Sequence, residues 1–113
     1  ANVEQRENEI QVDVVWQAQS TPDTDYTVFV QLLNADGQFL TGSDAQPAGG
    51  ERPTSGWIPT EYITDSHLIK LDSVNYRGDA TIIVGMYNPV NGERVLLLSG
   101  GDFVQIPVEL EIR

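Results

Sequence analysis

Apolar residues with a period of two are the feature of this 113-residue sequence that most restricts its fold. In residues 9–16 they fall on one face, at Ile10, Val12, Val14 and Trp16. Residues 104–112 repeat the pattern, with apolar residues at every second position. Because successive side chains of a strand point to opposite faces, this alternation is typical of half-buried β-strands.

Two other segments, residues 26–33 and 79–87, are apolar on both faces, which predicts central strands. Asp36-Gly37 and Asn91-Gly92 are hairpin signals, because glycine adopts positive φ without a Cβ clash. Pro107 cannot donate a ladder hydrogen bond, so the last strand is expected at a sheet edge or with a bulge.

Residues 42–60 hold four of the ten glycines and three of the six prolines, which predicts a long loop without regular structure. A strand over residues 61–71 is expected to follow, with a bulge or change of face at residues 65–67. No segment predicts a helix longer than one turn. The sequence therefore predicts an all-β fold, a two-layer antiparallel β-sandwich of immunoglobulin-like type with about seven strands. The absence of cysteine excludes the disulfide-bonded form of that domain.

Residues 1–8 are expected to form a polar linker, and residues 9–113 a single β-sandwich domain. The start at Ala1 shows neither an initiator methionine nor a signal peptide, so the chain is expected to be a processed protein or, as we favour, a piece of a larger one. The expected core consists of Val12, Val14, Trp16, Val28, Val30, Leu32, Ile82, Val84, Leu97, Val104, Ile106 and Val108.

The net charge of −11, from 6 basic and 17 acidic residues, disfavours binding to nucleic acids and to anionic membrane surfaces. No apolar run approaches the roughly 20 residues of a membrane span. The sequence has no phosphate loop and no dinucleotide-binding fingerprint, so no cofactor is expected. Its acids do not follow the spacing of a calcium-binding loop, and we interpret them as solvated turn residues without a metal ion.

The long loop is the place to look for a site, because function concentrates on long loops held by a rigid scaffold. The candidate ligand-binding residues are Asp44, Arg52, Thr54, Trp57 and Asp65. In one interpretation they form a carbohydrate surface, with an indole face for a sugar ring. In the other, which we favour, Asp44, Thr54 and Asp65 anchor the loop and Trp57 covers the open end of the core.

His67 is the sole histidine. Alternation along a strand directs Ser66 away from Asp65 and His67, so these three residues do not form a hydrolase triad. We therefore expect a surface or interface histidine and no catalytic residue in this chain.

An ordered set of short motifs covers roughly residues 10–98. Its members are Trp16-x-Ala18, Asp25-Tyr26-Thr27-Val28-Phe29-Val30-x-Leu32, Asp36-Gly37-Gln38, Asp44-x-x-Pro47, Pro53-Thr54-x-x-Trp57, Asp65 and Val84-Gly85-Met86-Tyr87-Asn88-Pro89-x-x-Gly92-Glu93-Arg94. The set resembles the small C-terminal, extracytoplasmic β domain of bacterial multi-pass membrane proteins related to dolichyl-phosphate-mannose mannosyltransferases. Thr60-Glu61 and Gln31 depart from the pattern, in which a Gly-Glu pair and a histidine are expected.

The resemblance implies a non-catalytic accessory domain on the periplasmic or cell-surface side of a membrane-anchored, glycosyltransferase-like protein. Its implied partners are a glycan or the parent membrane protein, and any transferase activity would lie outside this chain. A free-standing carbohydrate-binding module is the alternative.

Overall fold

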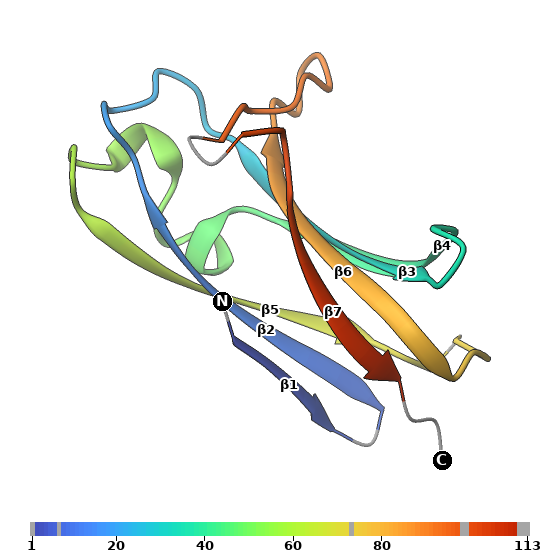
Figure 1. Ribbon diagram of the computed structural model, residues 1–113. Helices are drawn as coiled ribbons and strands as arrows, with labels where there is room; N and C mark the ends of the chain where they lie inside the picture. Colours follow the sequence, from blue (N-terminus) through green and yellow to red (C-terminus); the bar gives the residue numbers. More distant parts are fainter. Residues whose placement is uncertain (1, 7, 73, 98–99, 111–113) are drawn as a thin grey trace.

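The computed structural model describes residues 2–6, 8–72, 74–97 and 100–110, and it is built from β-strands (Figure 1). The strands are β1 (Asn2–Arg6), β2 (Glu9–Gln17), β3 (Thr27–Asn34), β4 (Phe39–Ala45), β5 (Tyr62–Lys70), β6 (Gly78–Tyr87) and β7 (Val104–Leu110). Two short 3-10 turns, η1 (Pro47–Gly50) and η2 (Thr54–Gly56), lie between β4 and β5. In the described ranges no helix is long and apolar enough to cross a membrane.

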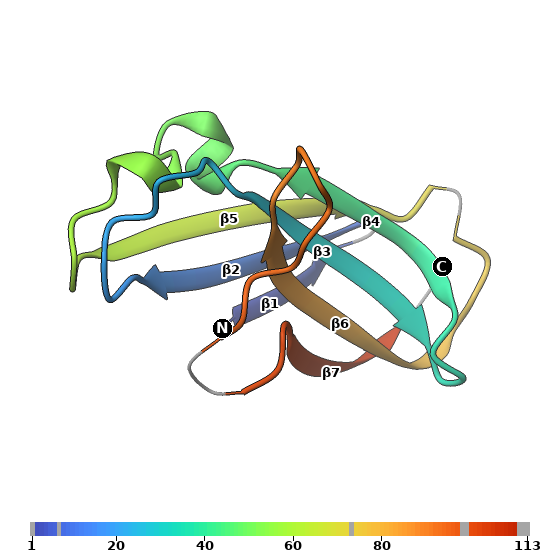
Figure 2. The same cartoon turned by 90° about the horizontal axis from the view of Figure 1, so that it is seen from above.

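The strands form two antiparallel sheets, with the orders β1-β2-β5 and β4-β3-β6-β7. Figure 2 shows the sheets as two layers, with β5 and β2 in one and β3 and β6 in the other. This confirms the prediction of a two-layer antiparallel all-β fold, while the immunoglobulin-like topology stays a prediction. The two-sided apolar segments become β3 and β6, which pair with each other in the middle of their sheet.

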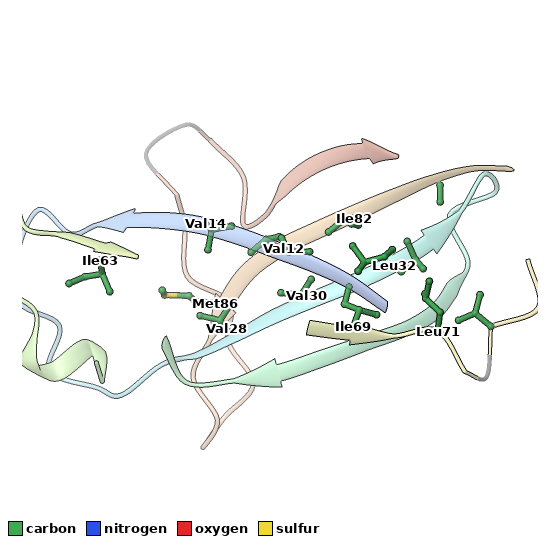
Figure 3. Close-up of a cluster of buried hydrophobic side chains, with 14 of the residues drawn as sticks. Val12, Val14, Val28, Val30, Leu32, Ile63, Ile69, Leu71, Ile82 and Met86 are labelled. Carbon is green, nitrogen blue, oxygen red and sulfur yellow. The ribbon is translucent and has the colours of Figure 1, made fainter. Parts of the chain in front are cut away.

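The core lies between the sheets, where Val12, Val30, Leu32 and Ile82 are fully buried (Figure 3). Burial is confirmed for seven predicted core residues: Val12, Val14, Val28, Val30, Leu32, Ile82 and Val84. Four others are half-buried: Trp16, Leu97, Ile106 and Val108. The prediction is wrong for Val104, which is 40% exposed. It begins edge strand β7, where fewer neighbours cover the inner face.

The edge position of β7 is confirmed, with Pro107 opposite Thr81 of β6, the one strand with which β7 pairs among the described residues. The first hairpin is confirmed as well, because Gly37 has a φ of 81° and its N–H donates to Asn34 O. The hairpin signal at Asn91-Gly92 predicts a return strand over residues 93–98, but in the described part of this segment the pairing is one bridge, Tyr87–Arg94. Residue 98 lies outside the described residues. Residues 111–113 lie outside them too.

Three expectations about element boundaries are corrected. Within the expected linker, residues 2–6 form β1, which pairs antiparallel with β2. Strand β4 continues to Ala45 inside the expected loop, because Ser43 and Asp44 keep the register with β3. Strand β5 has no bulge at residues 65–67 and pairs with β2 without a register shift. The alternation continues through these residues because Asp65 and His67 both point inward, where their side chains are hydrogen-bonded to each other.

Candidate functional site

Asp65 is the point at which β2, β5 and η1 are joined. The carboxylate is 1% exposed and receives hydrogen bonds from Trp16 Nε1 (3.0 Å) and Ala48 N (2.9 Å). His67 Nε2 lies 2.6 Å from Asp65 Oδ2. The expected surface histidine is therefore wrong: His67 is 4% exposed, because its position two residues after Asp65 puts it on the same inward face.

The ionisation of Asp65 follows from these contacts. Burial opposes its charged form, but the hydrogen bonds from His67, Ala48 and Trp16 outweigh this and lower its pKa below the ordinary 3.8. Asp65 is therefore a carboxylate at neutral pH. A buried charge is tolerated only with such partners, so the sheet and the loop depend on each other here.

Thr54 and Trp57 hold the second half of the loop. The hydroxyl of Thr54, fully buried, accepts from Tyr26 N at 3.0 Å and donates to Thr24 O. Trp57 is 4% exposed, and its Nε1 donates to Arg52 O at 2.9 Å. The interpretation of a self-supporting loop, with Trp57 over the end of the core, is confirmed for these two residues and for Asp65.

The side chains of Arg52 and Asp44 form other contacts, although the backbone O of Arg52 accepts from Trp57. Arg52 forms an ion pair of 2.7 Å with Glu61, and this contact lowers the pKa of the Glu61 carboxyl. The prediction that Asp44 anchors the loop is wrong. Asp44 lies on β4 opposite Phe29, and its Oδ2 accepts from Tyr87 OH at 2.8 Å. The five candidate residues therefore do not share one binding surface.

A cavity of about 290 Å3 opens at the end of the sandwich where the loop packs. Three aromatic side chains line it: Trp16 at the end of β2, Tyr26 before β3, and Trp57 after η2. Gln19 and Ser20 add polar groups at one side. Leu96, which is 81% exposed, adds an apolar side chain. Of the five candidates, Thr54 and Trp57 line this cavity.

No local pattern predicts this cavity, because its walls come from four segments that are far apart in the sequence. Trp16 was expected in the core and Leu96 in a strand. Only the packing of the two sheets shows that both face the same opening.

In the part of the chain that the structure describes, Tyr26 is the one titratable side chain that lines this cavity. Among the described residues, no three His, Cys, Asp or Glu side chains are grouped so as to hold a metal ion. Comparisons with protein-family models, with curated proteins and with solved structures found no match for this chain.

Proposed function

We propose that this chain is a non-catalytic β-sandwich accessory domain that binds a glycan in the cavity at its open end. The observation that carries the proposal is the pair of half-buried rings, Trp16 and Tyr26, at one cavity with polar groups at its side, where buried Trp57 completes the wall. A sugar ring has an apolar C–H face and a rim of hydroxyl groups. A concave site with aromatic and other apolar walls and a few polar groups matches that chemistry.

Both indole rings of the cavity are held in place before any ligand arrives. Trp16 Nε1 is bound to Asp65, and Trp57 Nε1 is bound to Arg52 O. Rings fixed in this way lose little conformational entropy on binding, which favours affinity. The hydrogen bonds to sugar hydroxyl groups would come from Gln19 and Ser20, both exposed.

In this proposal the domain belongs to a larger, membrane-anchored glycosyltransferase-like protein and lies on its extracytoplasmic side. The ordered motifs over residues 10–98 support this placement, since they resemble the C-terminal β domain of such proteins. A glycan-binding appendage there would hold a glycan near the parent enzyme. A free-standing carbohydrate-binding module would use the same cavity.

The test is an NMR titration of the domain with mannobiose, followed by a glycan array. We expect shift changes at Trp16, Tyr26 and Trp57, and binding about tenfold weaker in Leu96→Ala, which corresponds to about 1.4 kcal/mol. Val90→Ala is the matched control, because Val90 is 91% exposed and does not line the cavity.

Two outcomes contradict the proposal. One is the absence of binding to mannobiose and to every glycan on the array. The other is binding that maps outside the cavity and is equal in Leu96→Ala and Val90→Ala.

A further inference from the structure

The indole N–H groups at the cavity of the open end are used inside the protein. Trp16 Nε1 donates to Asp65 Oδ2 at 3.0 Å, and Trp57 Nε1 donates to Arg52 O at 2.9 Å. The N–H is the one donor that a tryptophan side chain has. Both rings therefore offer a ligand apolar surface and no further hydrogen-bond donor.

Two polar side chains of the cavity wall also donate to the protein. The Thr54 hydroxyl donates to Thr24 O, and Gln17 Nε2 donates to Thr60 O at 2.7 Å. A hydroxyl group has one hydrogen to donate, so Thr54 has none left for a ligand. The carboxamide of Gln17 keeps an oxygen that accepts. This part of the wall therefore favours a ligand that donates hydrogen bonds.

The charges around the cavity favour a cation over an anion. The side chains that the structure places in its lining include no lysine, arginine or histidine. The two arginines in the segments that form its walls are each paired with an acid, Arg52 with Glu61 at 2.7 Å and Arg94 with Asp102 at 3.7 Å. The net charge of −11 adds a general repulsion of anions. An acidic sugar therefore has little to attract it here.

One carboxylate lies at the rim of this cavity. Asp25 is exposed and directly precedes the lining residue Tyr26. Its Oδ1 accepts from Ser55 N at 3.1 Å, beside Thr54, which is another lining residue. The hydrogen bonds from Ser55 lower the pKa of the Asp25 carboxyl, so this group is negatively charged at neutral pH. An anion next to aromatic rings attracts a cationic ligand.

We propose, on the basis of the glycan-binding function proposed above, that the ligand of this cavity is an amino sugar with a free, protonated amino group. Its ring packs against Trp16 and Tyr26, and its ammonium group pairs with Asp25. An ammonium group has three donors and no acceptor, which matches walls whose indole and Thr54 donors are already used. The cation is also attracted to the faces of aromatic rings. N-acetylation removes this charge.

The probes are a β-1,4-linked glucosamine dimer and its N-acetylated form, which differ in the charge on their amino groups. We expect the free amine to bind about tenfold more tightly in NMR titrations at about pH 6, where such amino groups are protonated. Shift changes at Trp16 and Tyr26 locate the binding. A higher salt concentration should reduce the difference, because salt screens the exposed carboxylate of Asp25.

Two substitutions with the same change of net charge test Asp25. Asp25→Asn removes the charge but keeps an oxygen that accepts from Ser55 N. Asp36→Asn is the matched control, because Asp36 lies in the hairpin between β3 and β4, which Figure 1 shows on the side away from η1 and η2. We expect Asp25→Asn to bind both dimers with similar affinity, and Asp36→Asn to keep the preference of the wild type. A folded Asp25→Asn that keeps this preference would overturn the proposal. Unfolding midpoints show whether both variants fold.

Putrescine, a dication without a sugar ring, makes the test independent of any variant. We expect the glucosamine dimer to shift the signals of Trp16 and Tyr26, and putrescine at the same concentration to leave them unchanged. Equal shifts would reduce the effect to charge attraction and overturn the proposal.

Two further outcomes separate this proposal from glycan binding itself. If mannobiose and the acetylated dimer bind in the cavity as tightly as the glucosamine dimer, the preference for an amino sugar is wrong, while glycan binding stands. If none of the three sugars binds, the preference is wrong as well, and the glycan array then decides whether the cavity binds any glycan.

Discussion

Strands β5 and β6 lie in opposite sheets and bury their side chains in different ways. Strand β5 alternates along its whole length: Ile63, Asp65, His67 and Ile69 are buried, and the residues between them are exposed. Strand β6 is buried at five consecutive positions, residues 82–86. One strand therefore has a bare outer face, whereas the other is covered on both faces.

The outer face of β6 is covered at Gly85 by Phe29 of the neighbouring strand β3 and by the backbone at Asp102. Phe29 of β3, 2% exposed, lies on the outer face beside Gly85. The guanidinium of Arg94 lies 4.6 Å from the centroid of the Phe29 ring. A Cβ on Gly85 would lie 2.5 Å from the Phe29 ring and 2.6 Å from Asp102 O. The backbone thus approaches the sheet where a side chain would not fit.

The comparison separates two requirements for burial. Polar side chains of β5 point inward because Asp65 and His67 satisfy each other and bind Trp16 and Ala48. The outer face of β6 is covered at Gly85, where the Phe29 ring and Asp102 O lie closely against the backbone. Burial of the polar side chains of β5 depends on hydrogen bonds, whereas burial of the outer face of β6 depends on close packing. Different substitutions therefore disrupt the two.

The largest effect is expected from Asp65→Ala. It leaves Trp16 Nε1, Ala48 N and His67 without their buried partner, so the free energy of unfolding should fall by about 3–5 kcal/mol. Urea denaturation measures it. The control is Ser66→Ala, on the exposed face of the same strand, with an expected loss within about 1 kcal/mol. Equal losses would mean that the buried network does not stabilise β5.

A smaller effect is expected from Gly85→Ala on the outer face of β6. The added methyl group must displace the Phe29 ring and the backbone at Asp102, which costs about 1–3 kcal/mol. Gly56→Ala is the matched control, because its Cβ meets no atom within 4 Å. Denaturant midpoints compare the two. A midpoint for Gly85→Ala as high as that for Gly56→Ala would show that Phe29 and Asp102 do not pack against Gly85 as described.

The smallest effect is expected for the dependence of the unfolding free energy on acidic pH. Burial of Asp65 offsets part of the pKa decrease that its hydrogen bonds cause. The folded-state pKa of Asp65 is below 3.8, so its carboxylate stabilises the fold above about pH 4. That stability is lost as the pH falls through the folded-state value. The unfolding free energies of wild type and Asp65→Asn should therefore converge below pH 4 in denaturation at several pH values. A constant difference down to pH 2.5 would contradict the lowered pKa.

The sequence was sufficient for the strands whose pattern is local. Residues 9–16 predicted β2, and the two-sided segments predicted β3 and β6 in the middle of a sheet, because alternation and apolar content depend on a single strand. Pro107 predicted the edge position of β7 for the same reason: one missing N–H restricts one strand. Trp57 and Thr54 were also interpreted correctly as supports of the loop.

The tertiary structure alone decided which polar residues are buried and where the chain is open. His67 is polar in the sequence, and only its contact with Asp65 explains why it lies inside. Val104 is apolar in the sequence, and its place at the start of edge strand β7 explains its exposure. The physical reason is common to both: burial depends on contacts between segments distant in sequence, whereas periodicity records only to which side of its own strand a residue points.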